Sequence, residues 1–133
     1  MKKILITGGA GFMGSNSALH FAKNGWKIYL IDNLSRKGAK DNLSNLKKNI
    51  KLTFYKVDVS NFSSVSNIIR KIKPSLLIHC AGQVAVTKSL IDPRTDFNSN
   101  FSPAFKIWWT RQELNLRPLR CQHKSRRFLC QCN

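Results

Sequence analysis

The segment from Ile4 to Gly14 constrains the fold of this chain more than any other feature of its sequence. It reads Ile-Leu-Ile-Thr-Gly-Gly-Ala-Gly-Phe-Met-Gly, a short apolar run followed by closely spaced glycines. An apolar run of this length predicts a strand buried on both faces of a parallel sheet. Residues 15–23 then show helical spacing, and Asn24 with Gly25 supplies a C-terminal stop. A strand, a glycine-rich turn and a helix predict the start of a βαβ unit.

The same alternation of strand and helix continues to about residue 100. We expect further strands at 26–31, 52–57 and 76–78, helices at 41–48 and 62–72, and a helix that starts at Asp92 and Pro93. Like the first strand, 76–78 is expected to be buried on both faces. The predicted fold class is α/β, a Rossmann-type doubly wound parallel sheet that is truncated after about four strands.

The periodicity fails after about Asn100. Pro103 would lie inside the helix begun at Pro93, where a proline costs about 3 kcal/mol, and residues 108–121 show no sustained period. We therefore divide the chain into a half-domain, 1–105, and an irregular Arg- and Cys-rich tail, 106–133, interpreted as a frameshift or read-through segment. A zinc site is the alternative for the tail, but its four candidate ligands do not have the spacing of paired-ligand sites, so no metal is expected. These ligands are Cys121, His123, Cys130 and Cys132.

The formal net charge is +17, which by itself would favour nucleic acid or an anionic membrane as partner. The lysines are scattered through helices and loops rather than alternating with aromatic residues, so we expect neither partner. Three apolar residues after the charged start are too few for a secretory signal. Cys80 is the single cysteine before the tail, which favours a reducing compartment, and we expect a cytoplasmic protein.

The glycine-rich turn predicts a dinucleotide site. Gly8, Gly11 and Gly14 fit G-x-x-G-x-x-G, and Gly9 with the last two fits G-x-G-x-x-G. Glycines in this turn let main-chain amides approach a pyrophosphate and let the helix pack closely, while the helix N-terminus supplies partial positive charge. We assign Gly8, Gly11, Phe12, Met13 and Gly14 to cofactor binding.

Two aspartates end the next two predicted strands. Asp32 can accept hydrogen bonds from both hydroxyls of an adenosine ribose and would repel a 2'-phosphate, which favours NAD over NADP, although Arg36 and Lys37 could soften this exclusion. A cap of a helix or turn is a role Asp32 could share. Asp58, with Val59 beside it, is a candidate for the adenine edge, and a plain turn aspartate is the alternative.

Small residues follow the fourth predicted strand, where ligands of open α/β sheets bind. Ala81, Gly82 and Gln83 would let the backbone lie along the cofactor. His79 is a possible acid or base, but we interpret it, like Cys80, as a core residue.

The residues at 7–14, 32–36, 58–59 and 79–97 together resemble the extended short-chain dehydrogenase/reductase superfamily. Within it they resemble the NAD-dependent nucleotide-sugar epimerases and dehydratases, most of all those that epimerise CDP-linked sugars at carbon 2. The resemblance covers residues 1 to about 100 and implies NAD as cofactor and a nucleotide sugar as substrate of the parent enzyme. It also adds Asn33, Ser35, Arg36 and Asn100 to the cofactor-binding residues.

The resemblance also implies a catalytic pair that this chain does not have. The family uses a tyrosine four residues before a lysine, whereas Tyr29 and Tyr55 are followed at that spacing by Asn33 and Val59. We therefore expect an NAD-binding N-terminal part with no catalytic residue, inactive alone, whose parent could be an oligomer. A stand-alone NAD- or nucleotide-binding module and a basic nucleic-acid-binding protein are the alternatives.

Overall fold

The computed structural model describes residues 1–82, 94, 97–98 and 100–113. The elements follow the chain as β1 (Lys3–Thr7), α1 (Phe12–Lys23), β2 (Lys27–Asp32), α2 (Ala39–Asn49), β3 (Leu52–Lys56), α3 (Phe62–Ile72), β4 (Leu76–His79) and α6 (Phe101–Glu113). The four strands form one parallel sheet in the order β3-β2-β1-β4. The predicted Rossmann-type parallel sheet is thus confirmed, and the predicted helix start at 92–93 lies outside the described residues.

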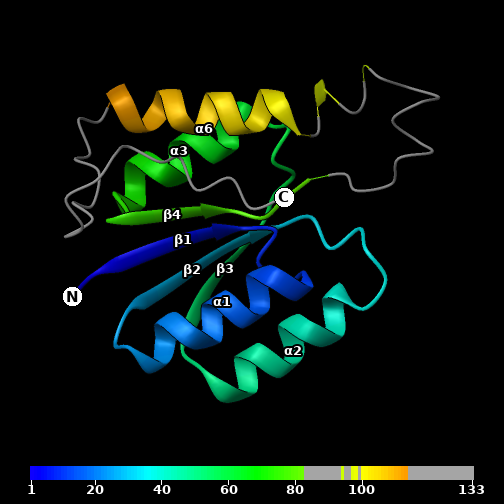
Figure 1. Ribbon diagram of the computed structural model, residues 1–133, viewed down its shortest axis with the longest axis vertical. Coiled ribbons are helices and arrows are strands. Elements are labelled where there is room, and N and C mark those ends of the chain that lie inside the picture. The colour runs from blue at the N-terminus through cyan, green and yellow to red at the C-terminus, as the bar shows by residue number, and fades with distance from the viewer. Residues whose placement is uncertain (83–93, 95–96, 99, 114–133) are drawn as a thin grey trace, which may run out of the picture.

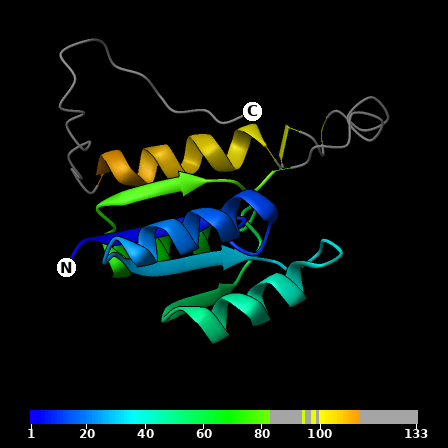
Figure 2. The same cartoon turned by 60° about the horizontal axis from the view of Figure 1, so that its bottom comes forward.

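Helices cover both faces of this sheet. Figure 1 shows α1 and α2 on one side of the sheet and α3 and α6 on the other, and in the turned view of Figure 2 helix α1 lies in front of the strands. Because the four strands are parallel, their carboxyl ends lie at one edge of the sheet. Ligands of doubly wound folds bind at this edge where the strand order reverses, which here is between β1 and β4.

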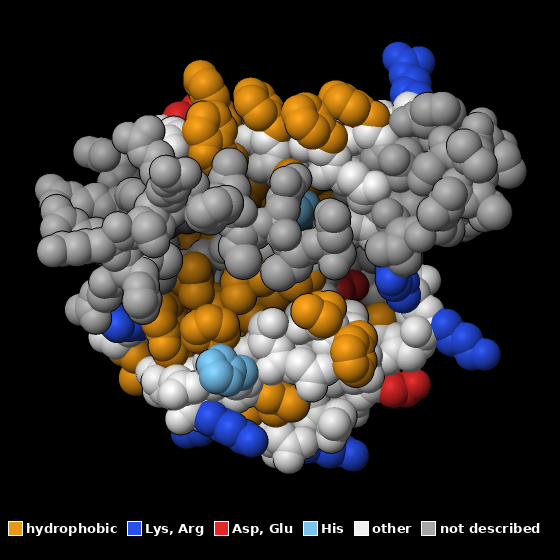
Figure 3. All heavy atoms as spheres, in the orientation of Figure 1, with side chains coloured by type: hydrophobic (Ala, Val, Ile, Leu, Met, Phe, Trp, Pro, Cys, Tyr) orange, Lys and Arg blue, Asp and Glu red, His pale blue; other side chains and the backbone are white. Residues whose placement is uncertain are grey.

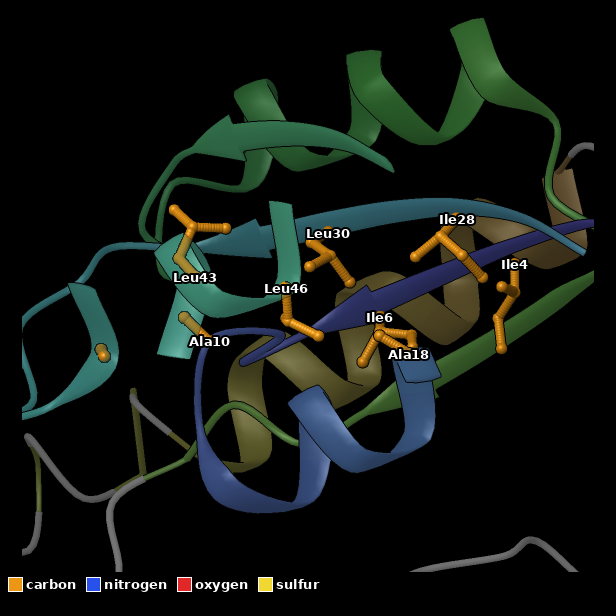
Figure 4. Packing of buried hydrophobic residues seen from close by; sticks show 9 residues of the cluster. Ile4, Ile6, Ala10, Ala18, Ile28, Leu30, Leu43 and Leu46 are labelled. Atoms are coloured by element: carbon orange, nitrogen blue, oxygen red, sulfur yellow. The ribbon is translucent and has the colours of Figure 1, made fainter. Parts of the chain in front are cut away.

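The core follows from the alternation of side chains along β1. Ile4 and Ile6 point to one face and pack with strand β2 and helices α1 and α2, whereas Leu5 points to the other face and packs against α3 and α6. Figure 4 shows the first of these clusters. Both faces of the central strand are covered, which explains why its apolar run has no polar alternation.

Strand β4 is less buried than its sequence predicts. All four of its residues are only partly buried, so the expectation of burial on both faces is wrong for this strand. The reason is its position: within the described residues β4 pairs with β1 alone and forms an edge of the sheet.

Helix α6 occupies residues where the sequence analysis expected the pattern to fail. The described helix begins at Phe101, so Pro103 lies in its first turn rather than in a helix interior. Amides of the first turn have no acceptor within the helix, and proline there sacrifices no hydrogen bond. Pro103 is also fully buried. Residues 106–113, predicted to be irregular, are therefore helical, while 114–133 lie outside the described residues.

The outer side of α6 carries a row of exposed aromatic rings. The exposed fraction of each residue lies between 43% and 59% for Phe101, Phe105, Trp108 and Trp109. Phe105 packs against each of the other three rings, and the two tryptophans also contact each other. Figure 3 shows hydrophobic side chains along this helix. The inner side packs on α3 through Ile107 and through Thr110, whose hydroxyl lies 3.3 Å from that of Ser66.

Within the described residues, no helix combines the length and the apolar character that crossing a membrane requires.

Candidate functional site

The glycine-rich turn lies at the carboxyl edge of the sheet, where it joins β1 to α1. A Cβ on Gly14 would lie 2.2 Å from the carbonyl oxygen of Gly8 and 2.7 Å from Cα of Gly9. Gly8 itself has a φ of +66°, and a Cβ there would lie 2.6 Å from the amide nitrogen of Ala81. Only glycine satisfies these two positions, because each neighbour is backbone and cannot rotate away. Helix α1 therefore starts directly against the turn.

The N-terminus of α1 has no side-chain cap. Gly11 stands at the N-cap position with extended backbone, and the first turn contains no acidic residue. The amides of Phe12 and Met13 consequently have no side-chain acceptor within the described residues, and both side chains are exposed. Uncapped amides at the positive end of a helix form an anion site, and the open main chain leaves room for one.

Asp32 holds the turn in place through both of its carboxylate oxygens. Oδ2 accepts a hydrogen bond from the Ala10 amide at 3.0 Å, and Oδ1 accepts one from the Leu34 amide at 2.8 Å. Leu34 adopts a φ of +59°, a strained conformation for a branched residue. A carboxylate has about four acceptor positions, so two remain for a ligand. The capping role weighed for Asp32 is thus present, and it is compatible with ribose binding.

The loop after β2 connects the ends of the other strands. Asn33 donates from its side-chain amide to Asp58 at 2.7 Å and accepts from the amide of Ser35 at 3.0 Å. Arg36 reaches across the site and donates to the carbonyl of Gly82 at 2.9 Å. These hydrogen bonds connect the loop after β2 with the residues that follow β3 and β4.

Asp58 is exposed at the end of β3 and strongly hydrogen-bonded. The hydroxyl of Ser60 donates to it at 2.6 Å, in addition to the amide of the same residue and the side chain of Asn33. These bonds, with the Ser60 hydroxyl contributing most, lower the pKa of the Asp58 carboxyl. The neighbouring Val59 is partly buried and packs against the cluster under α3.

The end of β4 and the start of α6 complete the site. Gly82 is exposed, and a Cβ there would lie 2.7 Å from Oδ1 of Asn100. Ala81 lies against Gly8, as described above, and Gln83 is outside the described residues. The structure therefore brings together every predicted cofactor residue that it describes except Val59, whose side chain points into the core.

The sequence analysis missed three residues of this site. Ala10 supplies an amide to Asp32, and its carbonyl accepts a hydrogen bond from the Asn42 side chain at 3.0 Å. Thr7, fully buried, is hydrogen-bonded to His79. All three contacts join residues far apart in the chain, and no local pattern signals them. His79 and Cys80, interpreted from the sequence as core residues, are only partly buried, and Cys80 packs against the cluster under α1 and α2.

The described residues contain no group of three His, Cys, Asp or Glu side chains placed to hold a metal. The candidate zinc ligands of the tail lie outside these residues.

Comparison with known families gives a match over nearly all of the chain. Residues 5–128 match the family described as GDP-mannose 4,6 dehydratase, and the match therefore extends past the predicted boundary at residue 105.

Individual relatives are nucleotide-sugar enzymes. CDP-paratose 2-epimerase of Salmonella typhi is 45% identical over 98 residues, which are 74% of this chain and 29% of that protein. UDP-glucose 4-epimerase of Bacillus subtilis is 33% identical over 104 residues, covering 77% of this chain and 30% of the relative. The chain thus spans about a third of the length of these relatives.

Solved structures of similar fold include two epimerases. The UDP-Glc/GlcNAc 4-epimerase from Campylobacter jejuni superposes with a TM-score of 0.80 at 29% identity, over 87% of this chain and 35% of that one. The Thermus thermophilus UDP-glucose 4-epimerase in complex with NAD gives a TM-score of 0.73 at 27% identity, over 86% and 35%.

Proposed function

The chain belongs to the GDP-mannose 4,6 dehydratase family, within the nucleotide-sugar epimerases and dehydratases, and from this premise we propose that it binds NAD as the N-terminal, cofactor-binding part of such an enzyme. The observation that carries the proposal is the cradle formed by Gly8, Gly14 and the uncapped start of α1. A Cβ at either glycine would overlap backbone atoms, and the helix N-terminus offers amides without a competing carboxylate. This arrangement fits a pyrophosphate.

Asp32 supports NAD rather than NADP. Its two oxygens are fixed by the amides of Ala10 and Leu34, so the carboxylate cannot turn away from a ribose at this edge. A 2'-phosphate would meet this fixed negative charge, and within the described residues Arg36 is hydrogen-bonded to the Gly82 carbonyl rather than to this carboxylate. We therefore propose that Asp32 binds the adenosine ribose, that Asp58 and Val59 lie near the adenine, and that the backbone at 81–83 follows the cofactor.

Bound NAD supplies a hydride acceptor for the transient oxidation of a sugar carbon. The similarity to CDP-paratose 2-epimerase supports a CDP-linked sugar as the substrate of the parent enzyme, with epimerisation at carbon 2. This chain has no tyrosine followed four residues later by a lysine. We therefore propose that it binds cofactor but has no epimerase activity alone.

The positions of the lysines argue against nucleic acid or a membrane surface as partner. Four lysines from different parts of the chain lie 5.4 to 5.7 Å from the centres of aromatic rings of the same chain, namely Lys2, Lys27, Lys47 and Lys106. Lys3 donates to the carbonyl of Ile72. These lysines are engaged with different parts of the chain, whereas a surface that binds a polyanion gathers its basic residues in one stripe or patch.

Calorimetric titration of the full chain with NAD, NADP and ADP-ribose tests the proposal. We expect NAD and ADP-ribose to bind and NADP to bind at least tenfold more weakly. A separate titration with a short duplex DNA tests the alternative function of nucleic-acid binding. If the chain binds DNA through its basic residues, the affinity should fall steeply as the salt concentration rises. Salt-sensitive binding of the DNA without binding of NAD or ADP-ribose would contradict the proposed function.

A further inference from the structure

Thr7 and His79 form a side-chain bridge directly beneath the glycine-rich turn. They are the last residues of β1 and β4 and lie opposite each other in the parallel ladder. Oγ1 of Thr7 and Nδ1 of His79 are hydrogen-bonded. Thr7 is completely buried, and Nε2 of His79 is buried with no hydrogen-bond partner among the residues that the structure describes.

The burial of both groups determines the direction of this hydrogen bond. If Nδ1–H donated to Thr7, the hydroxyl hydrogen and the Nε2 lone pair would both lack a partner. If the hydroxyl donates to Nδ1, only Nε2–H remains unpaired. Because each buried unpaired polar group costs free energy, the second arrangement is favoured, with the proton of the neutral imidazole on Nε2.

Beside this bridge, the glycine-rich turn lies directly against the end of β4. The residue after Thr7 is Gly8, whose missing Cβ leaves just enough room for the backbone of Cys80 and Ala81. The amide of Cys80 donates to the carbonyl of Thr7 at 2.9 Å. Since β4 is a partly exposed edge strand within the described residues, its carboxyl end depends on such contacts with β1 for its position.

We propose that His79 is a positioning residue for the cofactor turn: as the Nε2–H tautomer it accepts a hydrogen bond from Thr7 and so fixes Gly8 against β4. The inference rests on the proposed function only for its consequence, which is tighter binding of NAD. Burial lowers the pKa of His79, and this keeps the imidazole neutral and able to accept near neutral pH.

Nitrogen-15 NMR of the full chain labelled at histidine tests the tautomer without any ligand. We expect the long-range spectrum of His79 to show a protonated Nε2 and an unprotonated, hydrogen-bonded Nδ1. The exposed His20 provides an internal reference for a solvated ring. A proton on Nδ1 of His79 would overturn the proposal.

Two substitutions of Thr7 then test the positioning role. Thr7→Val removes the donor and keeps the shape, whereas Thr7→Ser keeps the hydroxyl. Hydrogen exchange of two amides reports the stability of the turn. The Gly9 amide donates to the carbonyl of Ile31, and the Gly11 amide donates to the carbonyl of Gly8. Loss of one buried hydrogen bond should raise their exchange about five- to tenfold in Thr7→Val relative to the amides of α3, and Thr7→Ser should restore protection.

Binding of NAD separates this inference from the proposed function. We expect Thr7→Val to weaken NAD about five- to tenfold and Thr7→Ser to bind as the unsubstituted chain does. If the unsubstituted chain does not bind NAD, the proposed function fails, while the exchange data still decide whether His79 and Thr7 position the turn. Equal acceleration of exchange in the turn and in α3, or no acceleration, would overturn the positioning role.

Discussion

Gly14→Ala tests whether the turn and α1 pack as closely as the structure shows. The substituted Cβ would lie 2.2 Å from the Gly8 oxygen and 2.7 Å from Cα of Gly9. Both atoms are backbone, so the strain is relieved only by moving the turn away from the helix. Overpacking of this kind costs about 1–3 kcal/mol. Helix propensity acts in the opposite direction, because alanine in a helix is favoured over glycine by about 1 kcal/mol.

The two effects give opposite signs for the change in stability. The overlap in the structure exceeds what side-chain motion can absorb, so we expect a net loss of about 1–2 kcal/mol in the free energy of unfolding by urea, followed by circular dichroism. Gly11→Ala is the matched control, because a Cβ there meets a single atom, the Gly8 oxygen, at 3.2 Å. We expect the control to lose less than about half as much. A Gly14→Ala variant as stable as the original chain would refute the close packing.

Three further predictions concern other parts of the fold. Ile107→Ala should lower the free energy of unfolding by about 2–4 kcal/mol, because this side chain is only 5% exposed. Trp108→Ala is the control and should lower it by less than about 1 kcal/mol, because Trp108 is 43% exposed. Equal losses in urea unfolding would mean that α6 does not pack on α3 with Ile107 facing inward. The lowered pKa of His79 predicts full stability above the ordinary histidine pKa and a decline as the pH falls below about 6.5, because the unfolded chain binds the proton more tightly. Thermal melts of His79→Gln should lack this decline, while those of His20→Gln should retain it. The lowered pKa of Asp58 means that its ionised carboxylate stabilises the fold above about pH 4, and that this stabilisation is lost as the pH falls further. The melting temperature of Asp58→Asn should therefore depend less on pH below about 4 than that of the original chain. An unchanged pH profile would count against the hydrogen bonds to this carboxylate.

The elements that the sequence predicted well are those whose pattern is local. The buried run of β1, the glycine turn and the spacing of α1 depend on neighbouring residues, and Asp32 and Asp58 follow from their places at strand ends. The residues that follow different strands lie near one another because the carboxyl ends of parallel strands share one edge of the sheet.

Features that depend on distant parts of the chain were not predictable in this way. The partial exposure of β4 follows from its place at an edge, and Pro103 is tolerated because the described helix begins two residues earlier. The bridge between Thr7 and His79 joins residues 72 positions apart. In each case strand order or packing, rather than residue spacing, decides the outcome.

The central claim, that the turn and Asp32 form an NAD site, is tested most directly by mapping amide chemical shifts of the labelled full chain during titration with NAD. We expect the largest changes at Gly11, Phe12 and Met13 and at Asp32, with only small changes in the amides of α3. Saturating NAD that leaves these four amides unmoved, or that shifts only residues of α6, would contradict the account.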